Sequence, residues 1–312
     1  MRKMMMLRND NMKRAMLLTL ALFVVVPVNA SAAVPEETKL YELAAGVYFR
    51  KCQTKPEFLG CNQGWVIFKD FVLVIDANFP NQAEEVVALI RSQTDKPIKY
   101  IFDTHHHGDH ADGNIIYKEI GAVPIASERT KPLFQTLGLE GFETSKKEKP
   151  DEYGDLAYKL PEIYFPRKMV FDDGEMRVEL LHFGHAHTGG DAVAWLPKQG
   201  ILFTGDCIVN GAFNFTGNSD TASWINVIDQ IKKLPVKTLA PGHGELGDMS
   251  TIKTQQRYFV ELRKEIAGFI RKGRTLEEIK MEVKLPWYKK WTGVDILERE
   301  ENIEHVYGEL TR

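Results

Sequence analysis

Short apolar runs rich in β-branched and aromatic residues alternate with turns in the first half of the chain, a pattern typical of strands. The predicted strands cover residues 46–50, 64–68, 71–76, 99–103 and 122–126. Apolar positions at helical spacing predict helices between them. These helices cover residues 83–92, 113–120 and 127–137. The run at 71–75 is apolar throughout, so we expect a strand that is buried on both faces.

The second half repeats this style after a charged stretch at 140–159 that carries Pro150 and Gly154. We interpret that stretch as a surface loop, which either frames a substrate cleft or is a solvated insertion. Strands are predicted after it at residues 168–171, 176–183, 192–196, 201–204 and 238–240. Helices are predicted at residues 223–234, from 251 to 270, after a capping box at 275–278, and at 296–310.

Two strand-rich halves with helices outside predict an α/β fold, a four-layer αββα sandwich of two sheets with flanking helices. We expect the sandwich to occupy residues 33–250 and a helical C-terminal extension to occupy 251–312. A hydrophobic content of 44% is enough for a sizeable core.

Residues 1–32 have the three parts of a secretory signal. Five Lys and Arg side chains precede an apolar stretch at 15–28, and Ala30-Ser31-Ala32 has the small-x-small form of a cleavage site. The apolar stretch is shorter than the about 20 residues of a membrane span, although an uncleaved anchor is the alternative. No second span is seen downstream, so we expect a soluble, exported protein, periplasmic in a bacterium, without a stable membrane span after signal removal.

Removal of the signal changes the charge balance. The remaining chain holds 35 Lys and Arg and 42 Asp and Glu, a net charge of −7 instead of −3 for the whole sequence. This balance argues against a nucleic-acid partner, because phosphate binding requires a basic surface. A small-molecule substrate is expected, and the sequence leaves the oligomeric state open.

The sequence contains three cysteines, which could form a disulfide in the oxidising periplasm. Cys52 and Cys61 flank a short loop with Pro and Gly, so a disulfide between them is one interpretation and two buried thiols are the other. Cys207 is the odd cysteine, and it directly follows Asp206.

Residues 104–110 hold four histidines and an aspartate directly after a predicted strand. Neutral imidazole and carboxylate oxygen are both zinc ligands. Because alternate residues of an extended loop point the same way, His105 and His107 can bind one ion. Asp109 and His110 begin a turn and can face a second ion. The alternative, a polar loop with stray histidines, is disfavoured by further ligand candidates downstream.

Those candidates lie in the segments 184–191, 203–207 and 241–243, each of which follows a predicted strand. Eight of the nine histidines lie in or beside these loops and the 104–110 loop. The eight are His105, His106, His107, His110, His182, His185, His187 and His243.

The H-x-H-x-D-H string with its three downstream segments resembles the metallo-β-lactamase superfamily over roughly residues 40–250. The resemblance implies an αββα sandwich with two zinc ions per chain at one edge between the sheets. By position, it implies a first zinc site of His105, His107 and His187. It implies a second site of Asp109, His110 and His243, with Asp206 bridging the two ions. Asp76 matches the family's structural Asp at a strand end.

The other histidines have different expected roles. His106 is expected to point away from the metals, either beside the ligands or toward solvent. His185 is an alternative to His187, but the family places the ligand directly before Thr, which favours His187. His182 is expected to be a strand residue or a neighbour of the ligands.

Within the superfamily, one set of segments resembles the zinc β-lactamases that use a cysteine ligand. These segments are residues 191–209 and 241–248. Asn218 after Gly217 resembles the Asn on the oxyanion side of those enzymes.

Other features resemble the glyoxalase-II-like hydrolases instead. His110 and Asp206 form a pair that such hydrolases have, and Asn210 stands where many cysteine-ligand β-lactamases carry a Lys for the substrate carboxylate. The tail after residue 250 is also longer than β-lactamases usually carry. Since adjacent residues of an extended chain point to opposite faces, only one of Asp206 and Cys207 should reach the metals. We favour Asp206, which leaves no carboxylate unpaired beside the site.

The resemblance implies a zinc-dependent hydrolase, because zinc lowers the pKa of a bound water to about 7 and polarises a carbonyl. Asp109 would orient the attacking water and take up its proton, and Asn218 would lie on the oxyanion side. Three hypotheses follow: a β-lactamase-like amide hydrolase, a periplasmic ester, thioester or lactone hydrolase, and a metal-binding accessory protein without catalysis.

Overall fold

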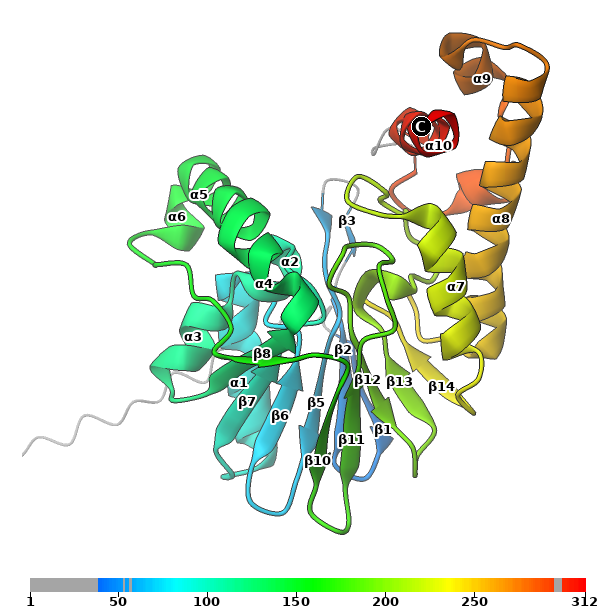
Figure 1. Cartoon of the computed structure of the whole chain (residues 1–312). Helices are drawn as coiled ribbons and strands as arrows, with labels where there is room; N and C mark the ends of the chain where they lie inside the picture. The colour runs from blue at the N-terminus through cyan, green and yellow to red at the C-terminus, as the bar shows by residue number, and fades with distance from the viewer. Residues whose placement is uncertain (1–38, 53, 56–57, 295–298) are drawn as a thin grey trace, which may run out of the picture. The chain divides into compact units, whose positions relative to one another are not determined.

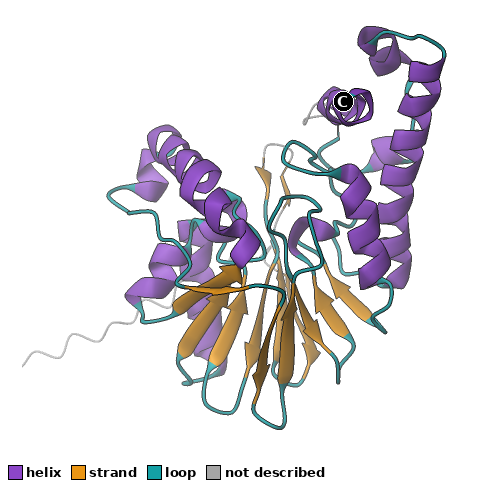
Figure 2. Ribbon diagram, in the orientation of Figure 1, coloured by secondary structure: helices purple, strands orange, loops and turns teal. Residues whose placement is uncertain are grey.

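The computed structural model describes residues 39–52, 54–55, 58–294 and 299–312. The predicted signal at 1–32 lies outside the described residues. Two sheets face each other with helices on their outer sides, as Figures 1 and 2 show. The predicted αββα sandwich is therefore confirmed.

The first sheet has seven strands in the order β1-β2-β5-β6-β7-β8-β9. Their bounds are Lys39–Ala44, Val47–Lys51, Gln63–Ile67, Val72–Ile75, Ile98–Phe102, Val123–Ser127 and Ile163–Phe165. All four residues of β6 are buried, as its apolar run predicted. Strands β6 to β9 run parallel, so their carboxyl ends meet at one edge of the sheet. The two edge strands of this sheet, β1 and β9, were not predicted from the sequence.

The second sheet has five strands in the order β10-β11-β12-β13-β14. Their bounds are Lys168–Asp172, Arg177–Leu181, Val193–Leu196, Ile201–Phe203 and Thr238–Ala240, so all five predicted strands of this half are present. A core of buried apolar side chains from both sheets fills the space between them, including Phe49, Phe102 and Phe203. A small hairpin of β3 (Thr54–Lys55) and β4 (Phe58–Leu59) lies apart from both sheets.

Helices cover the outer face of each sheet. On the first sheet, α1 (Pro80–Gln93) and α3 (Asn114–Glu119) bury apolar residues against β6 and β7. On the second sheet, α7 (Thr221–Ile231) and α8 (Met249–Arg271) do the same with a larger cluster centred on Trp224 and Phe259. The apolar side of each helix, which predicted the helix from the sequence, is the side that packs against the sheet.

The predicted surface loop at 140–159 is wrong in its first part. The chain forms α5 (Leu139–Glu148) and α6 (Pro150–Tyr153) there. Phe142 and Tyr153 are buried with ring centroids 5.1 Å apart, while most of the charged side chains face solvent. Two apolar positions in a charged stretch are too few to show a helical period.

The helix predicted at 127–137 is also broken into shorter pieces. A 3-10 turn at Glu128–Thr130 leads into α4 (Lys131–Leu133) and a π-helical turn at Phe134–Gly138.

The C-terminal extension is helical, as predicted. It contains α8, α9 (Leu276–Glu282) and α10 (Arg299–Thr311). Thr275 and Glu278 form the predicted capping box. Among the described residues, no helix is both long enough and apolar enough to span a membrane.

The three cysteines are free, buried thiols. The Sγ atom of Cys52 lies 3.6 Å from the Gln82 side-chain oxygen, whereas that of Cys61 lies 3.3 Å from the His110 ring. Each sulfur thus has a polar partner of its own, and the alternative with two unpaired thiols is the one found.

Candidate metal centre

The loops at the carboxyl ends of the strands bring the candidate residues together. His105 and His107 follow β7, and Asp109 and His110 lie in the single turn α2 (Gly108–Ala111). The other sheet contributes its members from three loops. His187 lies between β11 and β12, Asp206 lies in the turn after β13, and His243 follows β14.

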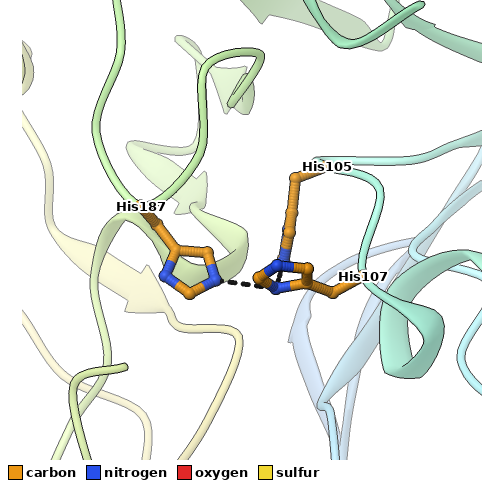
Figure 3. Close-up of side chains that lie close together, drawn as sticks. All are labelled: His105, His107 and His187. Carbon is orange, nitrogen blue, oxygen red and sulfur yellow. Dashed lines mark hydrogen bonds between the residues drawn. The ribbon is translucent and has the colours of Figure 1, made fainter. Parts of the chain in front are cut away.

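Three imidazoles form a first group, shown in Figure 3. His107 Nδ1 lies 3.1 Å from His105 Nε2 and 2.9 Å from His187 Nε2. Thus two residues of the β7 loop and one residue of the opposite sheet direct ring nitrogens at one small space. Such a trio of nitrogen donors is typical of a zinc site.

A second group lies beside the first and contains carboxylates. Asp109 Oδ2 is 3.1 Å from His243 Nε2 and 3.3 Å from His110 Nε2. Asp206 is central to both groups, because its carboxylate lies 3.3 Å from His110 and His243 and 3.6 Å from His187. The seven residues of the predicted site therefore converge.

Each ring of the first group is held by its other nitrogen. His105 Nδ1 lies 3.1 Å from the Thr104 hydroxyl. His107 Nε2 lies 2.9 Å from the Asn218 side-chain oxygen, and His187 Nδ1 lies 3.0 Å from the Phe215 carbonyl. Because carbonyl oxygens only accept hydrogen bonds, His107 Nε2 and His187 Nδ1 carry the protons that these two oxygens accept. This fixes the tautomer that leaves the inward nitrogen free to bind a metal.

The second group is held in the same way. His110 Nδ1 lies 3.0 Å from Asp76 Oδ2, and His243 Nδ1 lies 3.0 Å from the Gly60 carbonyl. The other oxygen of Asp76 accepts a hydrogen bond from the Thr104 amide at 2.8 Å. Asp76 has a φ of 63°, a strained value for a residue with a side chain. It joins the strand end to both groups, as its match to the family's structural Asp implied.

Close approach of the loops depends on glycine. A Cβ on Gly242 would overlap with Asp206 Oδ1 and with the Gly205 backbone. The absence of a side chain at Gly242 therefore lets the end of β14, with His243, lie against the turn that carries Asp206.

Burial and neighbouring charges shift the pKa values of the histidines in opposite directions in the two groups. Burial, followed by the neighbouring imidazoles, lowers the pKa of His105 and lowers the pKa of His187 to about 3. Burial alone would also lower the pKa of His243, but Asp206 and Asp109 raise it to about 10. The first group is therefore neutral at pH 7, whereas a cation at the second group must displace protons.

Two buried atoms show that the residues present fit a cation. His110 Nε2 and Asp206 Oδ1 are buried and make no hydrogen bond, although they lie 3.3 Å apart. Buried polar atoms without a hydrogen bond are destabilising in a folded protein. Ring nitrogens and carboxylate oxygens are ligands of zinc, so the residues present fit a metal at both groups.

Asp206 and Cys207 point to opposite sides, as predicted, although they lie in the 3-10 turn Gly205–Cys207 and not in the extended chain on which the prediction was based. Asp206 faces the histidines, whereas Cys207 is buried in the apolar cluster with Trp224 and Ile228. Burial raises the pKa of the Cys207 thiol well above its usual range, so the sulfur is a packing group there.

The remaining histidines of the predicted loops lie outside the two groups. His185 Nε2 lies 2.9 Å from the Asn218 carbonyl, and His182 Nδ1 lies 2.7 Å from the Asp191 carbonyl. His106 is buried rather than solvent-facing, and burial lowers its pKa to about 3. Neither ring nitrogen of His106 has a hydrogen-bond partner among the described residues.

At least three residues that contact the site, Cys61, Phe215 and Gly60, were not predicted from the sequence. Cys61 was considered only for a disulfide, yet its sulfur lies against the ring of His110. Phe215 contributes a backbone carbonyl to His187, and its ring centroid lies 6.0 Å from that of His107. A backbone acceptor has no residue-type signature, so no motif could have indicated Phe215.

A family model described as the metallo-beta-lactamase superfamily matches residues 56–243. The chain belongs to the metallo-beta-lactamase superfamily. The matched segment contains all seven predicted site residues and ends at His243.

The chain is similar in sequence to two relatives and in fold to one solved structure. It is 27% identical over 184 residues to the metallo-beta-lactamase type 2 of Bacillus cereus, a match that covers 57% of this chain and 64% of the relative. It is 23% identical over 252 residues to the metallo-beta-lactamase type 2 of Bacteroides fragilis, covering 78% and 94%. The solved metallo-beta-lactamase from Pontibacter korlensis shares the fold, with a TM-score of 0.60, 22% identity, and coverage of 72% of this chain and 99% of that one.

Proposed function

We propose that this superfamily hydrolase is an exported, dinuclear zinc enzyme that cleaves an amide or ester-type bond in the manner of a β-lactamase. The observation that carries the proposal is the convergence of five oriented imidazoles and two carboxylates, of which two buried atoms make no hydrogen bond. Supporting it are the relatives named metallo-beta-lactamase type 2.

The residues of the two groups have distinct parts in this proposal. His105, His107 and His187 would hold one zinc ion, and Asp109, His110 and His243 the other, with Asp206 between them. Bound zinc supplies a lowered pKa for water, to about 7, and polarises a carbonyl oxygen.

Two side chains would act on the substrate directly. Asp109 Oδ2 faces His243 and His110, a position from which it can orient the attacking water and accept its proton. Asn218 uses its side-chain oxygen on His107, so its amide N–H groups are left as donors for a substrate oxygen.

A second candidate function is the hydrolysis of esters, thioesters or lactones. The observation that favours it is the position of Asp206 among the histidines, with His110 beside it and Cys207 turned into the core. This arrangement resembles the glyoxalase-II-like branch, and Asn210 replaces the Lys of many cysteine-ligand β-lactamases.

The experiment is an assay of purified, zinc-loaded protein on a panel of β-lactams, thioesters and lactones. Turnover of β-lactams with the highest kcat/KM is the expected result. Turnover of thioesters or lactones alone would support the second function instead. A wild-type protein that works equally well without any metal would contradict both.

Export is a separate part of the proposal with a test of its own. Ala30-Ser31-Ala32 leads us to expect cleavage after Ala32. Mass spectrometry of the exported protein should therefore find Ala33 at the N-terminus. An intact N-terminus in a membrane fraction would contradict the soluble, periplasmic location.

A further inference from the structure

The C-terminal extension lies beyond the family match, yet it contacts a loop of the metal centre. The loop comprises residues 211–220, between β13 and α7, and we call it the Asn218 loop. The segment before α10 pairs with its start. Thr292 N–H donates to the Gly211 carbonyl at 2.7 Å, and Phe213 N–H donates to the Thr292 carbonyl at 2.9 Å.

Asn302 of α10 makes three hydrogen bonds from a fully buried position. Its Oδ1 accepts from the Thr216 hydroxyl at 2.7 Å. Its Nδ2 donates to the Asn214 carbonyl at 2.5 Å and to the Tyr258 hydroxyl of α8 at 2.8 Å. A single amide therefore connects the Asn218 loop to two helices of the extension.

Both ends of the loop have further bonds to the extension. The Tyr288 hydroxyl accepts from the Asn214 N–H at 2.7 Å. At the other end, His305 Nε2 lies 3.1 Å from the Ser219 carbonyl, and Glu309 accepts from the Thr221 N–H at 2.8 Å. The Asn214–Tyr288 bond is buried and the other two are partly buried, so breaking the first is the most costly, because the group left behind loses its partner away from water.

The Asn218 loop in turn holds the first imidazole group. The Phe215 carbonyl accepts from His187 Nδ1, and the Asn218 side-chain oxygen accepts from His107 Nε2. These two acceptors determine which nitrogen of each ring is left for a metal. No other loop supplies the outer partners of these two rings among the described residues.

We propose that the C-terminal extension is a positioning element of the first metal site, and that Asn302 is its central residue. The inference rests on the proposed dinuclear function. Through Thr216 and Asn214, Asn302 fixes the backbone of the loop at the residues that flank Phe215. The extension thus acts on the centre through the loop, since none of its described side chains belongs to the two groups.

The contacts between the extension and the Asn218 loop also position an apolar side chain, Phe215, beside the first imidazole group. The Phe215 ring is 38% exposed, with its centroid 6.0 Å from that of His107 and 6.1 Å from that of His187. A Cβ on Gly217 would overlap with this ring, so the loop is folded tightly around it. A substrate that reaches the first site would contact Phe215, whose place depends on the extension.

The test is Asn302→Ala in the full chain, compared with Thr216→Val, which removes the same bond from the loop side. Each is expected to weaken zinc binding at the first site by up to about 10-fold, the lower end of the range for direct outer partners of metal ligands, because both residues act on His187 and His107 through the loop. Competition with a chelator measures this, in the wild-type background and in a His110→Ala background that disables the second site. The Asn302→Ala/Thr216→Val double variant should lose less affinity than the product of the two single effects, since both substitutions remove the same Asn302–Thr216 bond.

Two controls separate positioning from stability. Ile279→Ala opens a cavity at a buried position in α9, in the same extension, without removing a hydrogen bond to the loop. Asn226→Ala removes an exposed amide on α7. Both should bind zinc at the first site as the wild type does.

The outcomes are distinct. Unchanged first-site affinity in both Asn302→Ala and Thr216→Val would overturn the inference while leaving the proposed function intact. The same loss of affinity in Ile279→Ala would also overturn it, because general stability would then be the cause. Absence of zinc binding by the wild type would instead contradict the proposed function.

Discussion

Replacement of His107 by alanine is expected to abolish zinc binding at the first site and to lower kcat/KM by well over about 100-fold. That figure is the upper end of the range for residues that only orient a metal ligand. The reason is geometric, because His107 Nδ1 faces both His105 Nε2 and His187 Nε2 at hydrogen-bond distance. Without His107, only two ring nitrogens are left as metal ligands, which is too few to hold a zinc ion.

The measurement is zinc per chain by elemental analysis after dialysis, together with turnover of the best substrate from the panel. The wild type should retain two zinc ions and the variant about one. His182→Ala is the matched control, since its ring nitrogen contacts the Asp191 carbonyl outside both groups. A His107→Ala variant that keeps two ions and full turnover would show that the first group is not a metal site.

Much of the fold could be predicted because each sheet strand of the second half has a clear apolar run. The strands that were missed, β1 and β9, lie at the edges of the first sheet, where few residues are buried. The helix α5 was mistaken for a loop because a single side chain in it, Phe142, is buried. In both cases the period of apolar residues was too weak to indicate the element.

The candidate site was more predictable than the fold, since its five histidines lie in three loops that each follow a predicted strand. What the sequence could not indicate is how the rings are held. His187 and His243 have backbone carbonyls as partners, from Phe215 and Gly60. Such partners depend on tertiary structure and not on residue type. The role of Cys61 beside His110 escaped for the same reason, since a spacing to Cys52 was its only visible feature.

Asp206→Asn and Cys207→Ser form the second decisive pair of variants. Asp206→Asn is expected to lose zinc from the second site and to lower kcat/KM by more than about 100-fold, the upper end of the range for residues that only orient a metal ligand. The Asp206 carboxylate lies 3.3 Å from both His110 and His243. In the proposed site its negative charge offsets part of the positive charge of the two zinc ions. The neutral amide of the Asp206→Asn variant would leave that positive charge uncompensated.

Cys207→Ser should keep both zinc ions and most of the turnover, at the expense of stability. Its sulfur packs in the apolar cluster around Trp224, where a hydroxyl would be buried in apolar surroundings. Thermal unfolding should therefore shift to a lower temperature while zinc content stays at two. If instead Cys207→Ser empties the second site and Asp206→Asn retains both ions, the cysteine is the ligand. The enzyme would then be closer to the cysteine-ligand β-lactamases than to the glyoxalase-II-like hydrolases, and His110 would be surplus to the second site.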